Sequence, residues 1–563
     1  MADYCMMNRS KFSKKHDIVF FFLCMIPLTC MLLVKCRYGV ANMDESFYLT
    51  IPYRLCQGDV LFLNEWHLSQ LSGWILKLPL SVFLRLNGGT EGIYLAFRFL
   101  YTALHLCGSV VLFLLFRKRS GIGAVLASVF YYVYVPFGIM ALSYNSMGLG
   151  FLSLSAAILV CTSKRWSDAL SGFLFAMAVL CCPYLVILFV IYAAAVLLCR
   201  KRGTGLDFLS PKRFGFFFLG IAVPAFCMLL EVLPHIRPDQ YSQIFAGIFS
   251  DPEHNTRLSF KLIHYFRILF DRNFLVIPGL IIVAGVLIKK PFVRNILNIL
   301  ILIFVAYRLV QSRESINFLI FPINTAGLYF YAVYRNRAVR DLFYGMWIPG
   351  MVYSLCIHLA SNQVFYVISS ASVVAMLASV IIIFVTLKDI WKDINPLIVK
   401  CALLCSLILV FVLQGALEVK LRWEQVFWEK GGIAAQTQLL QEGPHKGLLV
   451  STEAEKKYLS AADAVSRLET QGSLLVVGNA TYTYLFGSWT NSSYSAWIGT
   501  ETEYVLDRLT MYYTLNPDKL PDQVIIQDTH AGCAPYFEND SRYERCCETD
   551  DGWQIFRRNL AES

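Results

Sequence analysis

The chain has 563 residues, of which 57% are hydrophobic and only 16% are charged. This balance excludes an ordinary soluble protein and indicates an integral membrane protein. The formal net charge of +10 does not indicate a nucleic-acid partner, because the Lys and Arg residues form short clusters between apolar segments, where cations set membrane topology.

Thirteen apolar stretches predict membrane-spanning helices. The first follows a cationic N-terminal segment and carries no convincing cleavage site, so we expect an uncleaved anchor. Gly172 to Cys199 has cations at both ends and must cross twice, as two short helices broken near Cys182-Pro183. The stretches lie near residues 17–36, 96–116, 121–140, 147–163, 169–182, 184–199, 214–233, 274–288, 293–310, 316–334, 341–360, 364–387 and 397–415.

The charges also predict an orientation. With a cytoplasmic N-terminus, the cation clusters between the stretches all fall on the cytoplasmic side, and an odd number of crossings places the C-terminus outside. We expect a multi-pass protein, of a bacterial cytoplasmic membrane, with two long external loops at residues 37–95 and 234–273. Both loops have apolar positions interleaved with Trp, His and Gln or with cations, which favours amphipathic helices at the membrane interface.

Asp44 and Glu45 stand just after the first apolar stretch, where a membrane helix meets water. A carboxylate at the mouth of a membrane cavity can act as a general base on a lipid-linked substrate while the lipid stays in the bilayer. The alternative is that the pair only solvates the end of the helix. Both interpretations stay open on position alone.

Cations and polar residues gather on the same predicted face. Lys261, His264 and Arg267 are spaced to share one side of a helix, an external stripe that predicts an anionic lipid headgroup as partner. Ser143 to Ser146 forms an external turn, and Arg308, Gln311, Arg313 and Glu314 cluster where the ninth stretch ends. A solvated basic face, a snorkelling Arg, or an Arg313–Glu314 pair would explain the same residues structurally.

The composition changes after Ala416. Residues 1–416 predict a transmembrane domain and residues 417–563 an extracytoplasmic α/β domain, starting with an amphipathic helix from Val419 to Leu440. Short apolar runs at 447–450, 473–477 and 523–526 alternate with helical stretches such as 453–468, which predicts a partly parallel sheet. Cys533 has the spacing for a disulfide with Cys546 or Cys547.

The membrane half resembles the GT-C superfamily of membrane glycosyltransferases, in the branch of protein O-mannosyltransferases and the bacterial lipid A aminoarabinose transferase. Asp44-Glu45-Ser46-Phe47-Tyr48, then Gly58-Asp59, Gln70 and Arg98, carry the likeness, and Ser171 to Leu180 resembles the broken helix pair of that branch. One departure is Cys181-Cys182-Pro183 at the helix break, where members often carry a Lys.

The resemblance implies transfer of a sugar from a polyprenyl-monophosphate donor to a glycan, lipid or protein acceptor of the cell envelope, by an inverting single displacement. Asp44 would be the base, and Glu45 would orient Asp44 or the acceptor. Arg313, with Arg257, Lys261 or Arg267, would neutralise the donor phosphate. His67, Gln70, Tyr144 and Asn145 are candidate sugar or acceptor contacts.

No cofactor is expected. A divalent cation held by Asp44, Glu45, Asp251, Glu253 and His254 is the disfavoured alternative, because arginines can serve a monophosphate leaving group. Three other functions stay open: a transporter or flippase of a lipid-linked glycan, a ligase or polymerase acting on a diphosphate-linked oligosaccharide, and a membrane anchor for the C-terminal domain. The first would show more ionisable residues deep inside its helices and an inverted repeat.

Overall fold

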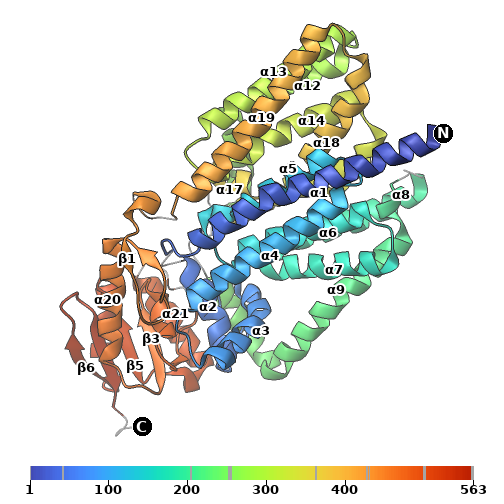
Figure 1. Ribbon diagram of the computed structural model, residues 1–563. Helices are drawn as coiled ribbons and strands as arrows, with labels where there is room; N and C mark the ends of the chain where they lie inside the picture. The colour runs from blue at the N-terminus through green and yellow to red at the C-terminus, as the bar shows by residue number, and fades with distance from the viewer. Residues whose placement is uncertain are drawn as a thin grey trace.

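The computed structural model describes residues 2–40, 44–202, 206–250, 257–361, 364–426, 429, 431–496, 498 and 502–559. Within them the chain is helical as far as Glu424, and a five-stranded sheet follows between Ser473 and Arg558. Figure 1 shows the long helices side by side, with the sheet beyond one end of them. That end also carries α2 (Asp44–Cys56) and α3 (Gln70–Asn87).

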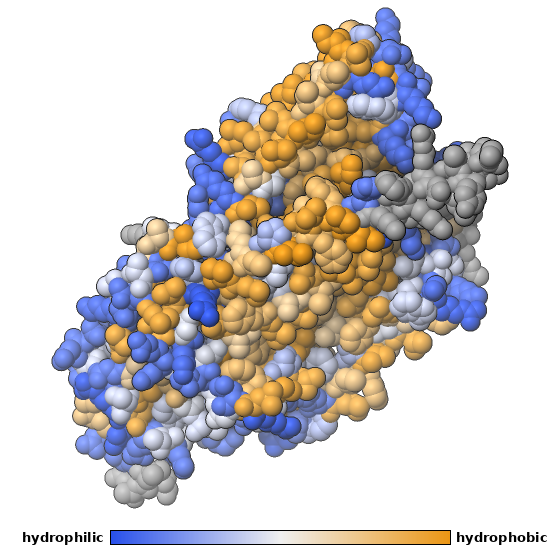
Figure 2. Space-filling view, in the orientation of Figure 1, coloured by the Kyte–Doolittle hydropathy of each residue, from blue (hydrophilic) through white to orange (hydrophobic). Residues whose placement is uncertain are grey.

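Ten helices of the described chain are long and apolar enough to cross a membrane, or eleven if a bent pair counts as one span. Figure 2 shows the corresponding apolar belt over the helices, with hydrophilic residues over the sheet. The long helices are α1 (Ala2–Lys35), α4 (Ile93–Phe116), α5 (Gly121–Val133), α6 (Tyr144–Cys161), α9 (Pro211–Val232), α13 (Pro291–Gln311), α14 (Phe321–Tyr334), α15 and α16 (Arg340–Leu342 and Ile348–Ala360), α18 (Val373–Ile390) and α19 (Leu397–Glu424).

All thirteen predicted stretches are largely helical, but a count of thirteen crossings is not confirmed. α7 (Arg165–Cys181) and α8 (Val186–Arg202) are separate helices that meet at Cys182 and Pro183, as the sequence predicts. Each has 17 residues, about 25 Å of helix, which is short for a hydrocarbon core of about 30 Å. α11 (Leu258–Asp271) and α12 (Val276–Leu287) form the bent pair, at an angle of 77°.

Glycines set the closest helix contact. α7 and α9 touch through Gly172 and Gly220, where an added Cβ would lie 1.8 Å from the Phe217 carbonyl oxygen and 1.9 Å from that of Ala169. Such small-residue contacts replace the hydrophobic driving force that is absent between helices in lipid. Arg213 closes one end of this pair by ion-pairing with Asp168 at 2.7 Å.

The predicted amphipathic helices of the two external loops are confirmed as helices. The first loop contains α2 and α3, and the second contains α10 (Tyr241–Phe249) and α11. Nearly all of α2 is buried, from Glu45 to Leu55. A further short helix, α17 (Phe365–Ser370), precedes α18.

The C-terminal part is a mixed α/β structure, as the sequence predicts. The strand order is β4-β3-β5-β7-β6, with β3 parallel to β4 and β5, and β7 antiparallel to β5 and β6. Its elements are α20 (Thr452–Ser466), β3 (Ser473–Val477), β4 (Thr490–Asn491), α21 (Thr502–Leu515), β5 (Gln523–Ile526), α22 (Ala534–Glu538), β6 (Tyr543–Glu548) and β7 (Gln554–Arg558). Two-residue strands β1 (Gln438–Leu439) and β2 (Leu449–Val450) precede them as an antiparallel pair.

Two details of this region differ from expectation or are left open. The helix predicted from Val419 to Leu440 is wrong beyond Glu424, because α19 runs without interruption from Leu397 to Glu424 and β1 begins at Gln438. The division of the chain at residue 416 stays a prediction. Cys533, Cys546 and Cys547 are free thiols in this structure.

Candidate functional site

Asp44 and Glu45 form the first turn of α2. Carboxylates are favoured there because unpaired backbone N–H groups give a helix N-terminus a partial positive charge. The two side chains have different surroundings. Asp44 is half-buried, whereas Glu45 is only 3% exposed.

Glu45 is part of a buried ion pair with Arg98 of α4. The Arg98 Nε and Nη2 donate to Glu45 Oε1 and Oε2, both at 2.6 Å, and Nη1 donates to the Cys36 carbonyl at 2.9 Å. Next to it, the Tyr94 hydroxyl donates to Ser46 Oγ at 2.8 Å. Both carboxylate oxygens of Glu45 thus hold α2 against α4, so Glu45 is better suited to orienting the helix than to binding an acceptor.

Asp44 faces a group of phenols. It interacts electrostatically with Tyr48 one turn along α2, with Tyr144 at the start of α6, and with Tyr366 of α17. Tyr48 and Tyr144 pack edge to face, with ring centroids 5.8 Å apart. Burial raises the pKa of Tyr48 well above its usual value, and the neighbouring Tyr144 phenol and Asp44 carboxylate raise it further. The phenols therefore stay protonated beside the carboxylate and can donate hydrogen bonds.

Asn145 brings an amide to the same place. It follows Tyr144 at the start of α6, where the Ser143 hydroxyl caps the helix by accepting from the Ser146 N–H. Asn145 is 6% exposed, and within the described chain no hydrogen-bond partner reaches its Oδ1. A buried amide oxygen without a partner is costly, and a substrate hydroxyl would satisfy it.

Two arginines lie among aromatic rings, one of which belongs to α17. The Arg272 guanidinium stands 4.9 Å from the Phe318 ring centroid and 4.6 Å from that of Phe365, and the Arg308 guanidinium stands 4.8 Å from that of Phe274. Neither is ion-paired with a carboxylate in the part of the chain that the structure describes. Arg308 is 7% exposed, its Nη1 donates to Gln311, and its Nε has no described partner.

α17 interacts with both the carboxylate and one of these cations. Phe365 stacks under Arg272, while Tyr366, the next residue, interacts with Asp44. The Asn317 Oδ1 fixes this arrangement by accepting from the Phe137 N–H at 2.9 Å and from the Ser370 hydroxyl at 2.9 Å. Adjacent residues of α17 thus interact with a carboxylate and with a cation that forms no ion pair among the described residues.

The cations chosen from the sequence are dispersed. Arg257 and Arg313 are exposed, and Arg267 is exposed and pairs with Asp271 at 3.7 Å. Lys261 turns inward, where its Nζ donates to the Leu359 carbonyl at 3.0 Å. The predicted stripe therefore does not converge on one anion, because Lys261 and Arg267 differ in burial. Arg272 and Arg308 are not among the cations chosen from the sequence; an Arg inside an apolar helix, as at position 308, is the signal that the sequence offers.

His67 lies in the loop after α2, and Gln70 is the first residue of α3. The His67 ring packs on Phe47 with centroids 5.0 Å apart, and its Nδ1 contacts the Ser69 hydroxyl at 2.6 Å. His67 is thus close to the first turn of α2. Gln70 is 1% exposed, and its Oε1 accepts from the Phe62 N–H at 2.6 Å, which stabilises a residue with a φ of 67°. This hydrogen bond gives Gln70 a structural task.

Among the described residues, no group of three or more His, Cys, Asp or Glu side chains could hold a metal ion. The expected alternative ligands Asp251, Glu253 and His254 lie outside the described residues.

No family model matches the chain, and no curated protein matches it in sequence. Two solved structures are similar to it in fold. The crystal structure of ArnT from Cupriavidus metallidurans bound to undecaprenyl phosphate has 12% identity and a TM-score of 0.46, with 97% of this chain and 98% of that chain covered. The apo ArnT structure has 13% identity and a TM-score of 0.48 over the same shares of the two chains. These are distant likenesses, and the function must be argued from the site.

Proposed function

We propose that the protein is a membrane glycosyltransferase that moves a sugar from a polyprenyl-monophosphate donor to a hydroxyl of an envelope glycan, lipid or protein. The observation that carries the proposal is that α17 interacts with both groups, with the half-buried Asp44 through Tyr366 and with Arg272 through Phe365. Arg308 lies on the ring of Phe274, which stacks on the same Phe365. The motif around Asp44, which resembles that of GT-C enzymes, points to the same reaction.

The chemistry assigns one side of the site to each substrate. The acceptor oxygen attacks the anomeric carbon, the bond from that carbon to the phosphate oxygen breaks, and the phosphate leaves with the electron pair. Asp44 takes the proton of the acceptor hydroxyl as general base. Arg272 and Arg308 receive the charge that develops on the phosphate, and the single displacement inverts the anomeric centre.

The surroundings of the two arginines suit an anion. Burial lowers the pKa of Arg272, although the charge of Glu314 partly opposes this. A phosphate that pairs with the guanidinium would offset this cost of desolvation. Because two arginines can neutralise a monophosphate, the proposal needs no metal ion.

Tyr144, Asn145 and His67 are proposed as sugar or acceptor contacts. Asn145 offers an unpartnered amide oxygen, Tyr144 stands beside Asp44, and His67 packs against the first turn of α2. Among the residues expected from the sequence, Arg313, Arg257 and Arg267 are not proposed as phosphate ligands, because all three are exposed.

The test is single-turnover consumption of a panel of polyprenyl-phosphate sugars by the purified protein in lipid nanodiscs. We expect one donor to be consumed by the wild type, and Asp44→Asn to slow its consumption by about 10²- to 10⁴-fold, the usual contribution of a general base. Asp239→Asn, an exposed carboxylate of the second external loop, is the matched control and should leave the rate unchanged. An Asp44→Asn variant as fast as the wild type would rule out the assigned base, and no consumption of any donor would favour a transporter.

A further inference from the structure

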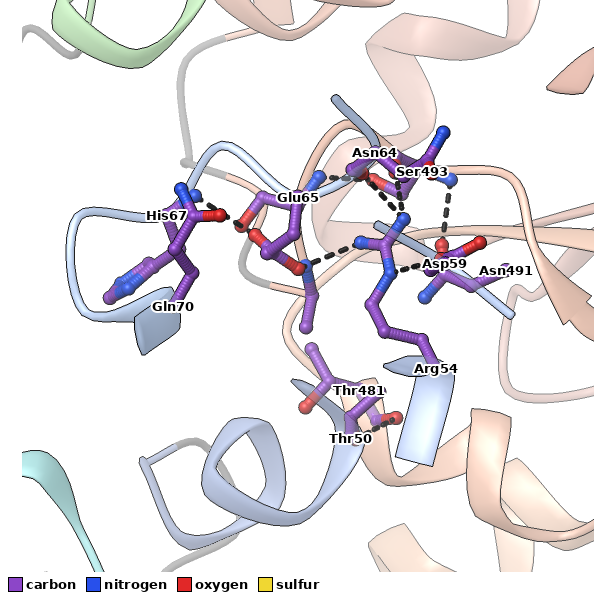
Figure 3. Close-up of polar contacts among 12 residues, drawn as sticks. Thr50, Arg54, Asp59, Asn64, Glu65, His67, Gln70, Thr481, Asn491 and Ser493 are labelled. Atoms are coloured by element: carbon purple, nitrogen blue, oxygen red, sulfur yellow. Dashed lines mark hydrogen bonds and ion pairs between the residues drawn. The ribbon is translucent and has the colours of Figure 1, made fainter. Parts of the chain in front are cut away.

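Four charged side chains form a closed, buried group beyond the other end of α2. Arg54 Nε contacts Asp59 Oδ2 at 2.5 Å, Arg54 Nη1 contacts Glu65 Oε2 at 2.7 Å, and Lys519 Nζ contacts Asp59 Oδ1 at 2.5 Å. The side chains are 0%, 3%, 0% and 17% exposed, for Arg54, Asp59, Glu65 and Lys519 respectively. Two cations face two carboxylates, so the group, which we name the Arg54 node, is neutral. Figure 3 shows Arg54 with Asp59 and Glu65.

The Arg54 node joins three parts of the chain. Arg54 belongs to α2, Asp59 and Glu65 to the loop after it, and Lys519 to the C-terminal region. Arg54 Nη2 donates to the Asn64 carbonyl at 2.7 Å and to the Ser493 carbonyl at 2.9 Å. Glu65 Oε2 also accepts from the Ala496 N–H at 2.9 Å, and Glu65 Oε1 accepts from the His67 N–H at 2.9 Å. Figure 3 shows these contacts converging on the Arg54 guanidinium and the Glu65 carboxylate.

Ser493 and Ala496, the two ends of one short segment, both contact α2. At one end the Ser493 carbonyl binds Arg54. At the other end Ala496 packs in a buried cluster with Phe47 and Tyr48, within four residues of Asp44. Between them the Tyr494 ring is held by Trp66, with ring centroids 6.0 Å apart, and by Arg508, whose guanidinium stands 4.4 Å from the ring centroid.

We propose that Arg54 is a positioning residue for Asp44, and that the C-terminal region is thereby a working part of the site. Arg54 fixes α2 against residues 493–496, which in turn pack beside the turn that carries Asp44. The inference rests on the proposed function of Asp44 as the base. A general base must be held within a fraction of an ångström of its proton, and a misplacement of about 1 Å costs about 10²-fold in rate.

The variant that tests the link is the charge-balanced pair Arg54→Gln and Glu65→Gln, which leaves the Asp59–Lys519 pair in place. Three quantities are measured in nanodiscs: amide hydrogen exchange of residues 44–56 and 490–496, affinity for undecaprenyl phosphate, and single-turnover consumption of the donor found above. We expect faster exchange in both segments, an affinity within about twofold of wild type, and a rate lower by about 10- to 100-fold. Arg54→Lys should give exchange and turnover rates between those of the wild type and the double variant, because an ammonium keeps the charge but cannot make all four contacts.

The matched control is Arg542→Gln with Asp540→Asn, which removes an ion pair of 2.6 Å in the same C-terminal region, away from α2. This control should change none of the three quantities. A double variant that exchanges faster but turns over at the wild-type rate would overturn the proposal, and so would faster exchange confined to residues 490–496. If the double variant does not fold, Arg54→Lys carries the same measurements.

The experiment separates this inference from the proposed function. If the wild type consumes no donor, the function fails, and hydrogen exchange alone decides whether the Arg54 node couples α2 to the C-terminal region. If the wild type consumes the donor and the double variant does so equally fast, the function stands and the positioning role is wrong.

Discussion

Two pairs of arginines stand in different surroundings in this protein. Arg54 and Arg98 meet carboxylates at 2.5–2.7 Å and backbone carbonyls with their remaining donors. Arg272 and Arg308 lie on aromatic rings and form no ion pair among the described residues, and Arg308 Nε has no described partner. A buried charge with complete pairing holds a structure together, whereas one without it retains the capacity to bind an anion.

Removing one member of a complete pair should have the largest effect. Glu45→Gln leaves Arg98 buried without its carboxylate, so we expect the free energy of unfolding to fall by about 3–5 kcal/mol. Denaturant unfolding in detergent measures this. The charge-balanced double variant Glu45→Gln and Arg98→Met should recover most of the loss. A loss under about 1 kcal/mol in the single variant would contradict the assignment of this pair as structural.

Removing an unpaired arginine should affect turnover instead. Arg308→Gln should slow donor consumption by about 100- to 1000-fold, or about 2.7–4 kcal/mol, because the leaving phosphate loses a charge partner. Its stability should not fall, since no ion pair is broken. Arg267→Gln, an exposed arginine, is the control. Slow turnover of both variants, or a large stability loss in Arg308→Gln, would remove the distinction between the two classes of arginine.

His445 extends the comparison of paired and unpaired buried groups to a neutral side chain. His445 is enclosed by Tyr94, Tyr458 and Tyr482, at centroid distances of 4.1, 4.6 and 5.2 Å, and neither ring nitrogen has a described partner. Burial, with the charge of Arg98, lowers the pKa of His445 well below 6.5. The unfolded chain therefore binds a proton below pH 6.5 that the folded chain refuses, and stability is lost as the pH falls.

Below pH 6.5 the free energy of unfolding should fall by up to about 1.4 kcal/mol per pH unit. Unfolding measured from pH 7 to pH 4.5 tests it, and His445→Phe should flatten this part of the curve, since a phenyl ring fits among the three tyrosines. Identical pH curves for the two proteins would show that His445 titrates normally.

Arg313→Gln should have a small effect, under about threefold on donor consumption, because an exposed guanidinium is screened by water and salt. This variant tests whether the phosphate ligand is Arg313, as chosen from the sequence, or Arg308, as chosen from the structure. A loss as large as that of Arg308→Gln would return Arg313 to the phosphate site.

Metal removal should change nothing. Incubation with EDTA is expected to leave single-turnover rates as they were, because two arginines take the phosphate charge. A loss that Mg²⁺ restores would instead direct attention to Asp251, Glu253 and His254.

The sequence was informative where local pattern decides structure. Apolar length and flanking cations identified the helices. The sequence placed Asp44 just after the first apolar stretch, and the structure adds that Asp44 begins the next helix, α2. The long-range pairing of charges was not predictable, because Glu45 and Arg98 are 53 residues apart and Asp59 and Lys519 are 460 apart. Such contacts depend on the packing of whole helices.

The choice between Arg308 and Arg313 shows the same limit. Five residues correspond to a rotation of about 140° on a helix, so the two side chains cannot face the same way. The end of α13 at Gln311 lies between the two arginines, so the pattern of the helix does not extend to Arg313. Only the rings of Phe274, Phe318 and Phe365, from separate elements, identify the inner pair.

The most direct test of this account is the affinity of the protein for undecaprenyl phosphate in nanodiscs, compared between wild type, the double variant Arg272→Gln and Arg308→Gln, and Arg267→Gln. We predict that the double variant binds about 100-fold more weakly, while Arg267→Gln binds as the wild type does. Equal affinity of all three proteins would contradict the claim that the unpaired arginines form the phosphate site.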